Sequence, residues 1–319
     1  MIGAAILALL LGSFFASSGL ADGTEKAMAV VTAHRSASDL NFDTQPFKLT
    51  AHATFSNSKK PKTTIQYVYI HLDEKHWRSQ VIADNGYERV RARSGEQLWT
   101  ASNLPFTPAF IYDLRSGLPS PPEMMPPTLE GLKYKDRGSL RCTQQMGTEQ
   151  CFDSTSLMQF EKRKMMDEDE ILRFSDYREF GKKKVAYHAV WQRNDAPFLE
   201  ITIDAIEPLT LNDPKWFVSP PAAEQVTWCD TPTPPKPVHT PDPSYPPTAR
   251  NDRVQGPVQL FMALGADGKV RNVAVIRPLR KDLDDPAAAA ASEWQFQPAM
   301  CGAIPMPWDL RVEINFHLY

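Results

Sequence analysis

Eight prolines fall within the seventeen residues from Thr231 to Pro247. Proline fixes its own φ angle and has no backbone N–H, so a run this dense excludes helices and interior strands and favours an extended polyproline II segment. A chain of 319 residues is long enough for about two domains. The sequence therefore predicts a Pro-rich linker at residues 231–247, between an N-terminal domain at residues 40–225 and a C-terminal domain at residues 241–319.

The charges of the chain nearly cancel. It holds 35 Lys and Arg against 38 Asp and Glu, a formal net charge of −3 at neutral pH, which gives no global field for binding a nucleic acid backbone. Its histidines and cysteines show no metal-ligand spacing, and no nucleotide-binding or nucleophile motif stands in a suitable context. We therefore expect a protein that is not an enzyme, with no cofactor, no metal and no nucleic acid partner.

The first residues form an apolar stretch from Ile2 to Ala21 that ends in the small residues of Gly19-Leu20-Ala21. This ending is typical of a cleaved secretory signal peptide. The stretch is also long enough to span a bilayer as a retained anchor, so residues 1–21 are a signal peptide or an N-terminal anchor. Both interpretations place the rest of the chain in the periplasm, either soluble or tethered to the inner membrane by residues 1–21.

Four cysteines are compatible with an oxidising compartment, where disulfides persist. The eight residues between Cys142 and Cys151 are polar and contain a glycine, which suits a short hairpin loop. We therefore predict a bond between Cys142 and Cys151 and, by elimination, a bond between Cys229 and Cys301 that ties the Pro-rich linker to the last domain.

The N-terminal domain contains short runs of β-branched and aromatic residues, separated by turn-forming residues. This pattern predicts an antiparallel sheet. The predicted strands are residues 47–55, 63–72, 76–83, 87–94, 96–100, 139–146, 149–153, 171–180, 185–191 and 197–206. Apolar residues at Phe106, Phe110, Ile111 and Leu114 predict a helix at residues 104–118 that lies on one face. A sheet with one apolar face and a covering helix is a half-open barrel, which either covers an apolar ligand or packs its own helix.

The C-terminal domain has a different order of elements. Alternating apolar residues predict strands at 256–264 and 269–276, followed by an alanine-rich helix at 282–294, a short return segment at 294–299 and a last strand at 308–319. The expected architecture of this domain is a two-layer ββαβ fold, and the fold class of the whole chain is α+β.

A series of motifs in the last domain resembles the C-terminal domain of the TonB family. The landmarks are Tyr245-Pro246, Ala249-Arg250, Gly256-Pro257-Val258, Asp267-Gly268-Lys269-Val270, Leu283-Asp284, Trp294-Gln295-Phe296-Gln297-Pro298-Ala299 and Gly302. The resemblance implies an energy transducer domain that grips a segment of an outer-membrane receptor by adding it as a strand at the sheet edge. The expected edge is Arg311 to His317, which gives Arg311, Glu313, Asn315 and His317 as partner-contacting residues. Tyr245 is a further candidate, with packing in the core as the alternative.

The N-terminal domain, from Phe47 to Pro221, resembles the half-barrel of the LolA-like lipoprotein carriers found in front of TonB-type domains. The residues that carry the resemblance are Leu140-Arg141-Cys142, Cys151-Phe152-Asp153, the run from Tyr177 to Lys182, and the run from Phe217 to Pro221. This resemblance implies that the concave face binds a lipid or another apolar molecule.

Two functions follow as hypotheses. The first is an exported cell-envelope protein of the TonB family that binds other envelope proteins, outer-membrane transporters among them, by strand addition in energy-coupled transport. The alternative is a periplasmic carrier that holds a lipid or another hydrophobic ligand in the N-terminal half-barrel.

Overall fold

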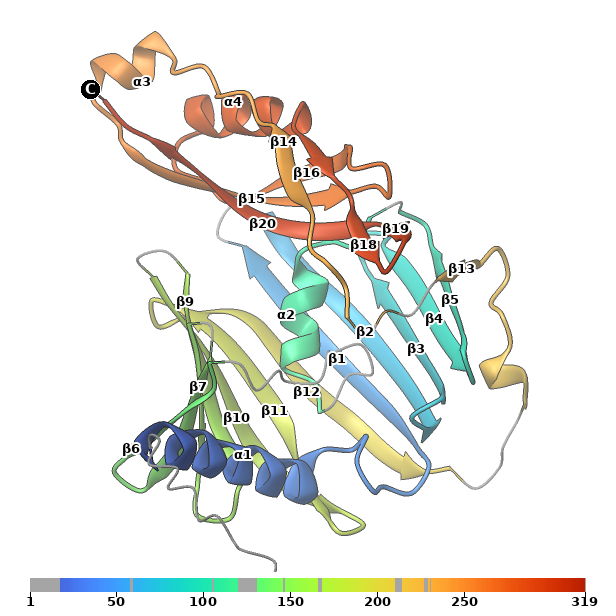
Figure 1. Cartoon of the computed structure of the whole chain (residues 1–319). Helices are drawn as coiled ribbons and strands as arrows, with labels where there is room; N and C mark the ends of the chain where they lie inside the picture. Colours follow the sequence, from blue (N-terminus) through green and yellow to red (C-terminus); the bar gives the residue numbers. More distant parts are fainter. Residues whose placement is uncertain are drawn as a thin grey trace, which may run out of the picture.

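The structure is a computed structural model that describes residues 18–57, 60–104, 106–119, 131–145, 147–165, 168–209, 214–226, 229 and 231–318. These residues form two units, which we call the half-barrel domain (residues 18–226) and the C-terminal module (residues 231–318). In Figure 1 the C-terminal module lies above the half-barrel domain, next to helix α2 (Phe110–Ser116).

One large antiparallel sheet makes up most of the half-barrel domain. Its strands lie in the order β13-β5-β4-β3-β2-β1-β12-β11-β10-β9-β8-β7-β6. Their bounds are β1 Phe47–Asn57, β2 Lys60–Asp73, β3 His76–Ala83, β4 Glu88–Ser94, β5 Gln97–Ser102, β6 Lys133–Arg137, β7 Leu140–Gln145, β8 Thr148–Phe152, β9 Met158–Met165, β10 Glu168–Phe180, β11 Lys183–Arg193, β12 Ala196–Pro208 and β13 Glu224–Val226. Two meanders, β1 to β5 and β6 to β12, join through the pairing of β1 with β12, and the whole sheet is strongly curved (Figure 1).

Burial along the strands follows the predicted alternation. On β11 the residues Val185, Ala189 and Trp191 are buried, and their neighbours are more exposed. The buried side chains of β1, β2, β3, β11 and β12 meet those of helix α2 (Phe110–Ser116) in one hydrophobic core. The predicted one-sided apolar face is confirmed, and the helix expected on it is present.

Helix α2 is shorter than the predicted helix at residues 104–118. It begins after Pro108, and a proline disfavours helical geometry in the residue before it. At the other end, Gly117 follows the helix. A Cβ atom at this position would overlap Cδ1 of Ile201 on β12, so glycine lets the end of α2 approach the sheet closely.

A second helix, α1 (Ser18–Ser38), contacts β6, β7 and β11 through a face that includes Ala27 and Val30. The Nζ atom of Lys183 donates a hydrogen bond to the Ser36 carbonyl at 2.9 Å. This bond satisfies a backbone acceptor in the last turn of α1. No element was predicted for residues 22–46, so this helix was not expected. Most of the expected signal peptide or anchor, residues 1–17, lies outside the described residues. Within the described part of the chain, no helix has the length and apolarity needed to cross a bilayer.

Strands β6 and β9 were also missed. Their sequences, KYKDR and MQFEKRKM, are dominated by charged residues, and β6 lies at the edge of the sheet with mostly exposed side chains. An edge position needs little apolar surface, which explains why β6 has no apolar pattern. Strand β9 lies inside the sheet between β8 and β10, and four of its eight residues are charged.

The C-terminal module is built on a three-stranded antiparallel sheet in the order β16-β15-β20, with helix α4 on one face (Figure 1). The elements are β14 Lys236–His239, α3 Pro247–Asn251, β15 Gly256–Leu264, β16 Val270–Arg277, α4 Lys281–Ser292, β17 Gln295–Gln297, β18 Ala299–Cys301, β19 Ile304–Met306 and β20 Trp308–Phe316. Leu260 and Met262 of β15 pack on Leu283 and Ala287 of α4. The predicted strands and helix are present, and the return segment is divided into β17 and β18.

The Pro-rich segment is extended, but it is not a free tether. Within it, β14 pairs with β17, and the Thr233 N–H donates to the Met300 carbonyl at 2.8 Å. The segment therefore packs along the C-terminal module.

The sheet of the C-terminal module is covered on both faces along β15. Gln259, Phe261 and Ala263 point away from α4, yet only 3–5% of each residue is exposed. Helix α2 of the half-barrel domain lies on that side (Figure 1), and the rings of Tyr112 and Phe261 are 5.5 Å apart between centroids. The two-layer expectation therefore holds for the module alone, because the half-barrel domain adds a third layer.

Candidate functional site

The predicted partner-binding strand, β20, lies at the edge of its sheet. Among the described residues it pairs with β15 only, so the backbone groups along its other side are not used by the sheet. Glu313 and Asn315 are exposed, while Ile314 and Phe316 between and after them are buried towards α4. His317 is exposed and follows the last residue of the strand.

Arg311, the first predicted contact residue, is not a free surface residue. Its Nη2 atom lies 3.1 Å from Oδ1 of Asp113 on α2, and only 27% of the Arg311 side chain is exposed. The same Asp113 oxygen accepts from Nη2 of Arg163 on β9 at 2.7 Å. Arg311 therefore joins the two units, and the predicted set is divided between this interface and the exposed end of β20.

A second contact lies beside the first. The Tyr112 hydroxyl donates to Oδ2 of Asp309, which precedes Arg311 by two residues and so lies on the same face of β20. Burial raises the pKa of the Asp309 carboxyl above its ordinary value, and the hydrogen bond from Tyr112 and the charges of Arg115 and Arg89 oppose this rise. Neighbouring residues of α2 thus bind alternate residues of β20.

The ion pairs continue into the half-barrel domain. Arg163 contacts Glu170 at 2.6 Å, and Glu170 also pairs with Arg193 at 2.6 Å. The Arg163 guanidinium lies 4.0 Å from the ring centroid of Trp191, whose indole N–H donates to the Asp113 carbonyl at 3.0 Å. This network was not predicted, because α2 and β20 are distant in the chain from the consecutive strands β9, β10 and β11, which supply its other members.

A pocket of about 430 Å³ lies at the end of β20. It is lined by Tyr245, Arg250, Arg253, His317 and Leu318. The structure therefore brings the predicted residues Tyr245 and His317 together. Tyr245 also packs in the core, because its ring meets the Phe316 ring edge-on at 5.4 Å and its hydroxyl donates to the Val254 carbonyl.

The concave face of the half-barrel domain is occupied by the protein's own side chains. Trp77, Tyr69 and Trp191 are almost fully buried there, together with Ile111 and Leu114 of α2. An apolar ligand would have to displace α2 from this face.

Part of the same face is basic. On β4 the alternate residues Arg89 and Arg91 pair with Val81 and Ser79 of β3, which point inwards, so both arginines face the interior. Burial, with the charge of Arg89, lowers the pKa of Arg91 to about 9, and burial together with both of these arginines lowers the pKa of Arg115 on α2 to about 9. Arg91 and Arg115 therefore remain charged at neutral pH.

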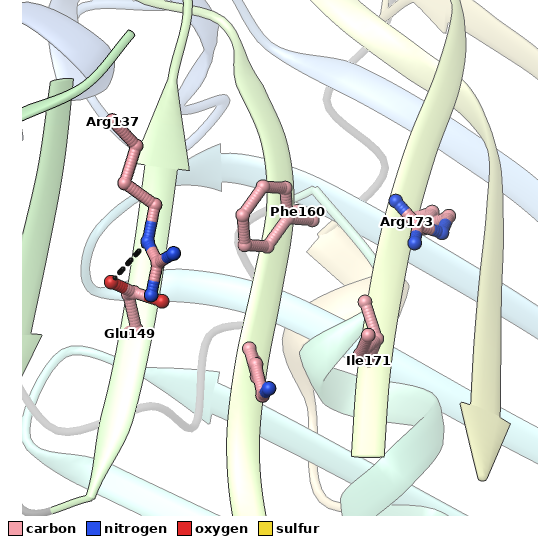
Figure 2. A pocket seen from close by; sticks show the side chains of 6 residues that line it. Arg137, Glu149, Phe160, Ile171 and Arg173 are labelled. Atoms are coloured by element: carbon pink, nitrogen blue, oxygen red, sulfur yellow. Dashed lines mark hydrogen bonds and ion pairs between the residues drawn. The ribbon is translucent and has the colours of Figure 1, made fainter. Parts of the chain in front are cut away.

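A smaller pocket of about 120 Å³ lies between β8, β9 and β10 (Figure 2). Leu172 of β10 faces α2, so its neighbours Ile171 and Arg173 line this pocket from the opposite, outer face of the sheet. Glu149 is engaged there by Nε of Arg137 at 2.8 Å. The charged residues that line it are already paired: Arg137 with Glu149, Lys162 with Asp169 and Arg173 with Gln192.

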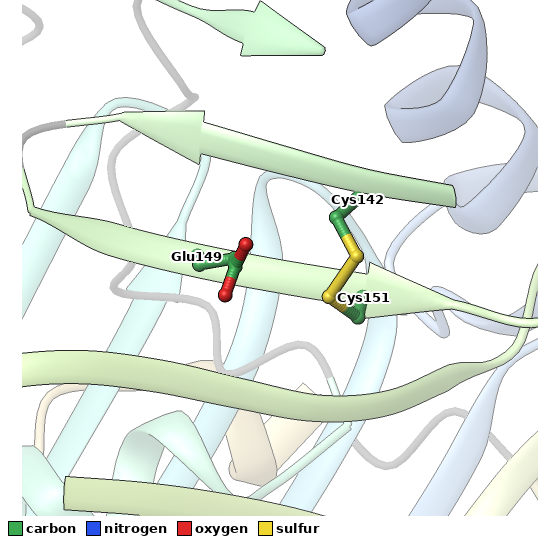
Figure 3. Close-up of side chains that lie close together, drawn as sticks. All are labelled: Cys142, Glu149 and Cys151. Carbon is green, nitrogen blue, oxygen red and sulfur yellow. A yellow bond between two sulfur atoms is a disulfide. The ribbon is translucent and has the colours of Figure 1, made fainter. Parts of the chain in front are cut away.

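Both predicted disulfides are present. The S–S distances are 2.05 Å for Cys142–Cys151 and 2.09 Å for Cys229–Cys301, which confirms the two pairings. Glu149 lies beside the first bond, and its carboxylate and the two sulfur atoms are within 4.8 Å of one another (Figure 3). Since the sulfur atoms are bonded to each other, they offer no thiolate to a metal ion.

Comparison with known proteins finds a family for the C-terminal module. Residues 241–318 match the family model described as Gram-negative bacterial TonB protein C-terminal. Protein TonB from two strains of Xanthomonas campestris pv. campestris is 39% identical over 77 residues, which are 24% of this chain and 34% of each TonB protein.

Two solved structures overlap with the N-terminal part of the fold. A LolA superfamily protein from Nitrosomonas europaea aligns with a TM-score of 0.41 and 6% identity, over 60% of this chain and 97% of its own. An outer membrane lipoprotein-sorting protein domain from Vibrio parahaemolyticus, described as putative, aligns with a TM-score of 0.37 and 10% identity, over 61% and 96%. Residues 241–318 of the C-terminal module thus match the TonB C-terminal family, in a chain that spans about a third of the length of the TonB proteins it matches.

Proposed function

We propose that the C-terminal module binds an extended segment of another cell-envelope protein, such as an outer-membrane transporter, by adding it as a strand to β20 in energy-coupled transport. The observation that carries this proposal is the position of β20, which pairs with β15 on one side only among the described residues. Backbone N–H and C=O groups on a free strand edge can pair with an incoming strand without a particular side-chain sequence. The match to the TonB C-terminal family supports the same function.

The end of β20 is the accessible part of this edge. Asp309 and Arg311 are engaged by α2, whereas Glu313 and Asn315 are exposed. In Figure 1 the C-terminal end of β20 extends beyond the half-barrel domain. We therefore expect a partner segment to pair first with residues 313–316.

Site-specific photo-crosslinking in cells tests the location. A photoreactive amino acid in place of Asn315 should capture an envelope protein. The same photoreactive group in place of Lys281 on α4, whose side chain is 88% exposed, serves as the control. It should capture much less of that envelope protein than the group at position 315. Equal capture at both positions, or no capture at Asn315, would contradict strand addition at β20.

The mode of binding has its own test. Peptides that cover the captured segment are N-methylated at one backbone nitrogen at a time, and their affinities for the full chain are compared. In an added strand every second N–H points to β20, so we expect loss of affinity with a period of two residues. A loss that follows side-chain identity without this period would indicate another binding mode.

A second candidate function is the carriage of an apolar ligand by the half-barrel domain. The supporting observation is that its aromatic concave face is covered by α2, a helix of only seven residues. Native purification followed by solvent extraction and mass spectrometry should find a lipid at near-stoichiometric amount. Protein that is free of lipid after detergent-free isolation would contradict this function.

We also propose that the chain works in the periplasm. Two disulfides support this location, because such bonds form and persist in oxidising compartments. Release of the protein by osmotic shock, or its retention in the inner-membrane fraction with the remainder accessible to protease in spheroplasts, would agree with it. Recovery in the cytoplasmic fraction with all four thiols reduced would contradict it.

A further inference from the structure

Helix α2 is held between the two units of the chain (Figure 1). On one side, Ile111 and Leu114 are buried in the core of the half-barrel domain. On the other side, Tyr112 and its neighbour Asp113 contact β15 and β20 of the C-terminal module. The helix therefore belongs to two interfaces at once.

A helix of this length depends on such contacts. It has only seven residues, whereas isolated helices shorter than about 12–15 residues are marginal in water. Its N-cap residue, Ala109, makes no capping bond from its side chain. Packing against the two units consequently decides where α2 lies.

The contacts from the C-terminal module are specific. The Tyr112 hydroxyl donates a hydrogen bond to Asp309. Nη2 of Arg311 lies 3.1 Å from Oδ1 of Asp113, and these two side chains are only 27% and 9% exposed. Such a pair is worth more than an exposed one, because water and salt screen it less. Both contact residues of the module belong to β20, so the first half of this strand is engaged while α2 covers the concave face.

We propose that the C-terminal module clamps α2 over the concave face, so that docking of the module and entry of an apolar molecule oppose each other. This inference rests on the proposed carriage of an apolar ligand and adds a control to it. A ligand that displaces α2 also removes the contacts that α2 makes with β20. By thermodynamic linkage, docking weakens ligand binding by the same factor as the ligand weakens docking. Loading of the half-barrel domain thus releases the first half of β20 from α2.

Titration with an apolar fluorophore tests the inference. N-phenyl-1-naphthylamine gains fluorescence in apolar surroundings, and its Kd is measured for the full chain with both disulfides intact. The double substitution Asp309→Ala and Arg311→Gln removes the polar contacts from β20, and we expect the fluorophore to bind about fivefold more tightly. The matched control, Asp285→Ala and Lys281→Gln, removes an exposed ion pair on α4 and should leave the affinity unchanged.

A lock on α2 assigns the binding to the concave face. A Cβ atom at Gly117 would lie 3.5 Å from Cβ of Ala189 on β11, a separation that suits a disulfide. Gly117→Cys and Ala189→Cys are therefore combined with Ile201→Val, which removes the Cδ1 atom that the new Cβ would overlap. The oxidised variant should bind the fluorophore about tenfold more weakly than the same variant with serine in place of both new cysteines.

Two further measurements separate the clamp from general loosening of the fold. Cooperative urea unfolding of each variant shows that the chain is folded. Hydrogen exchange in peptides that cover residues 110–116 should be faster in the β20 double variant, and in the wild type with bound fluorophore, than in the wild type alone.

The outcomes distinguish the clamp from the carriage of a ligand. Equal affinities of the wild type, the β20 double variant and the control would overturn the clamp and leave the carriage of an apolar ligand intact. Undiminished binding to the locked variant would place the fluorophore outside the concave face and overturn the clamp as well. Failure of every protein to bind the fluorophore would overturn the carriage of an apolar ligand and this inference with it.

Discussion

Replacement of Asp113 by asparagine should weaken the contact between the half-barrel domain and the C-terminal module. Its carboxylate accepts from Arg163 at 2.7 Å and from Arg311 at 3.1 Å, and the Asp113 side chain is only 9% exposed. Asparagine has almost the same shape but no charge, so the substitution removes two ion pairs without creating a cavity. The perturbation is therefore electrostatic.

The expected loss of unfolding free energy depends on which partners Arg163 and Arg311 keep when the Asp113 carboxylate is removed. Breaking a buried ion pair by removing one partner costs about 3–5 kcal/mol when the remaining charge is left uncompensated. Arg163 keeps Glu170 at 2.6 Å, and Arg311, whose side chain is 27% exposed, can be hydrated. We therefore expect Asp113→Asn to reduce the free energy of unfolding by about 2–3 kcal/mol and Arg311→Gln by about 1 kcal/mol.

A double-mutant cycle measures the pair itself. The free energies of unfolding of the wild type, Asp113→Asn, Arg311→Gln and the double variant are obtained from urea titrations. Tryptophan fluorescence follows the unfolding, and Trp191, which contacts both Asp113 and Arg163, is one of the seven tryptophans that contribute to it. We expect a coupling energy of about 1 kcal/mol, against less than about 0.5 kcal/mol for the exposed pair of Lys281 and Asp285. A coupling energy between Asp113 and Arg311 below about 0.3 kcal/mol would refute the reasoning, because the two residues would then act independently.

Three further predictions concern single positions and one disulfide. Burial lowers the pKa of His71 to about 4, whereas the unfolded value is near 6.5, so the neutral form is favoured by folding and stability is lost as pH falls from 6.5 towards 4. The loss of unfolding free energy from this group is at most about 3 kcal/mol. In urea titrations at pH 7 and pH 5, the His71→Phe variant should lose less stability between the two pH values than the wild type. An identical pH dependence in both proteins would argue against this role of His71. Gly268→Ala should cost about 2–4 kcal/mol, because φ is +75° and the new Cβ would overlap the Phe296 carbonyl oxygen; a thermal midpoint within 2 °C of the wild type would count against this packing. Replacing Cys229 and Cys301 by serine removes a cross-link between residues 72 apart in the chain. In the chain-entropy model this should reduce the free energy of unfolding by about 4 kcal/mol, measured by urea titration under oxidising conditions. An unchanged urea midpoint would contradict this prediction.

Much of the fold could be predicted because its signals are local. Strand β3 was predicted at residues 76–83 and β15 at residues 256–264, with the bounds that the structure has. In both, apolar side chains recur at every second position, and turn formers stand at the ends. The disulfide pairings could also be predicted. Cys142 and Cys151 flank a loop short enough to place them opposite each other on β7 and β8, which leaves Cys229 and Cys301 as the second pair.

Other elements gave no local signal. Helix α1 has few apolar residues on its packed face, and much of its contact with the sheet is made by small residues such as Ala27. Half of the residues of β9 are charged, and two of them pair with β10: Lys162 with Asp169 and Arg163 with Glu170, each at 2.6 Å. Such elements are stabilised by partners from distant parts of the sequence, and local propensity is a weak guide where tertiary contacts decide the structure.

The sequence by itself determined which residues of β20 face the core of the C-terminal module, because a strand alternates its side chains and apolar ones are buried. It predicted the opposite face as a surface for partners. Only the tertiary structure decided that Asp309 and Arg311 on that face contact α2, whereas Glu313 and Asn315 remain exposed. The physical reason is that a period of two separates the faces of a strand but carries no information about what covers the polar one. Its cover comes from a helix almost two hundred residues earlier in the chain, brought there by the packing of two domains.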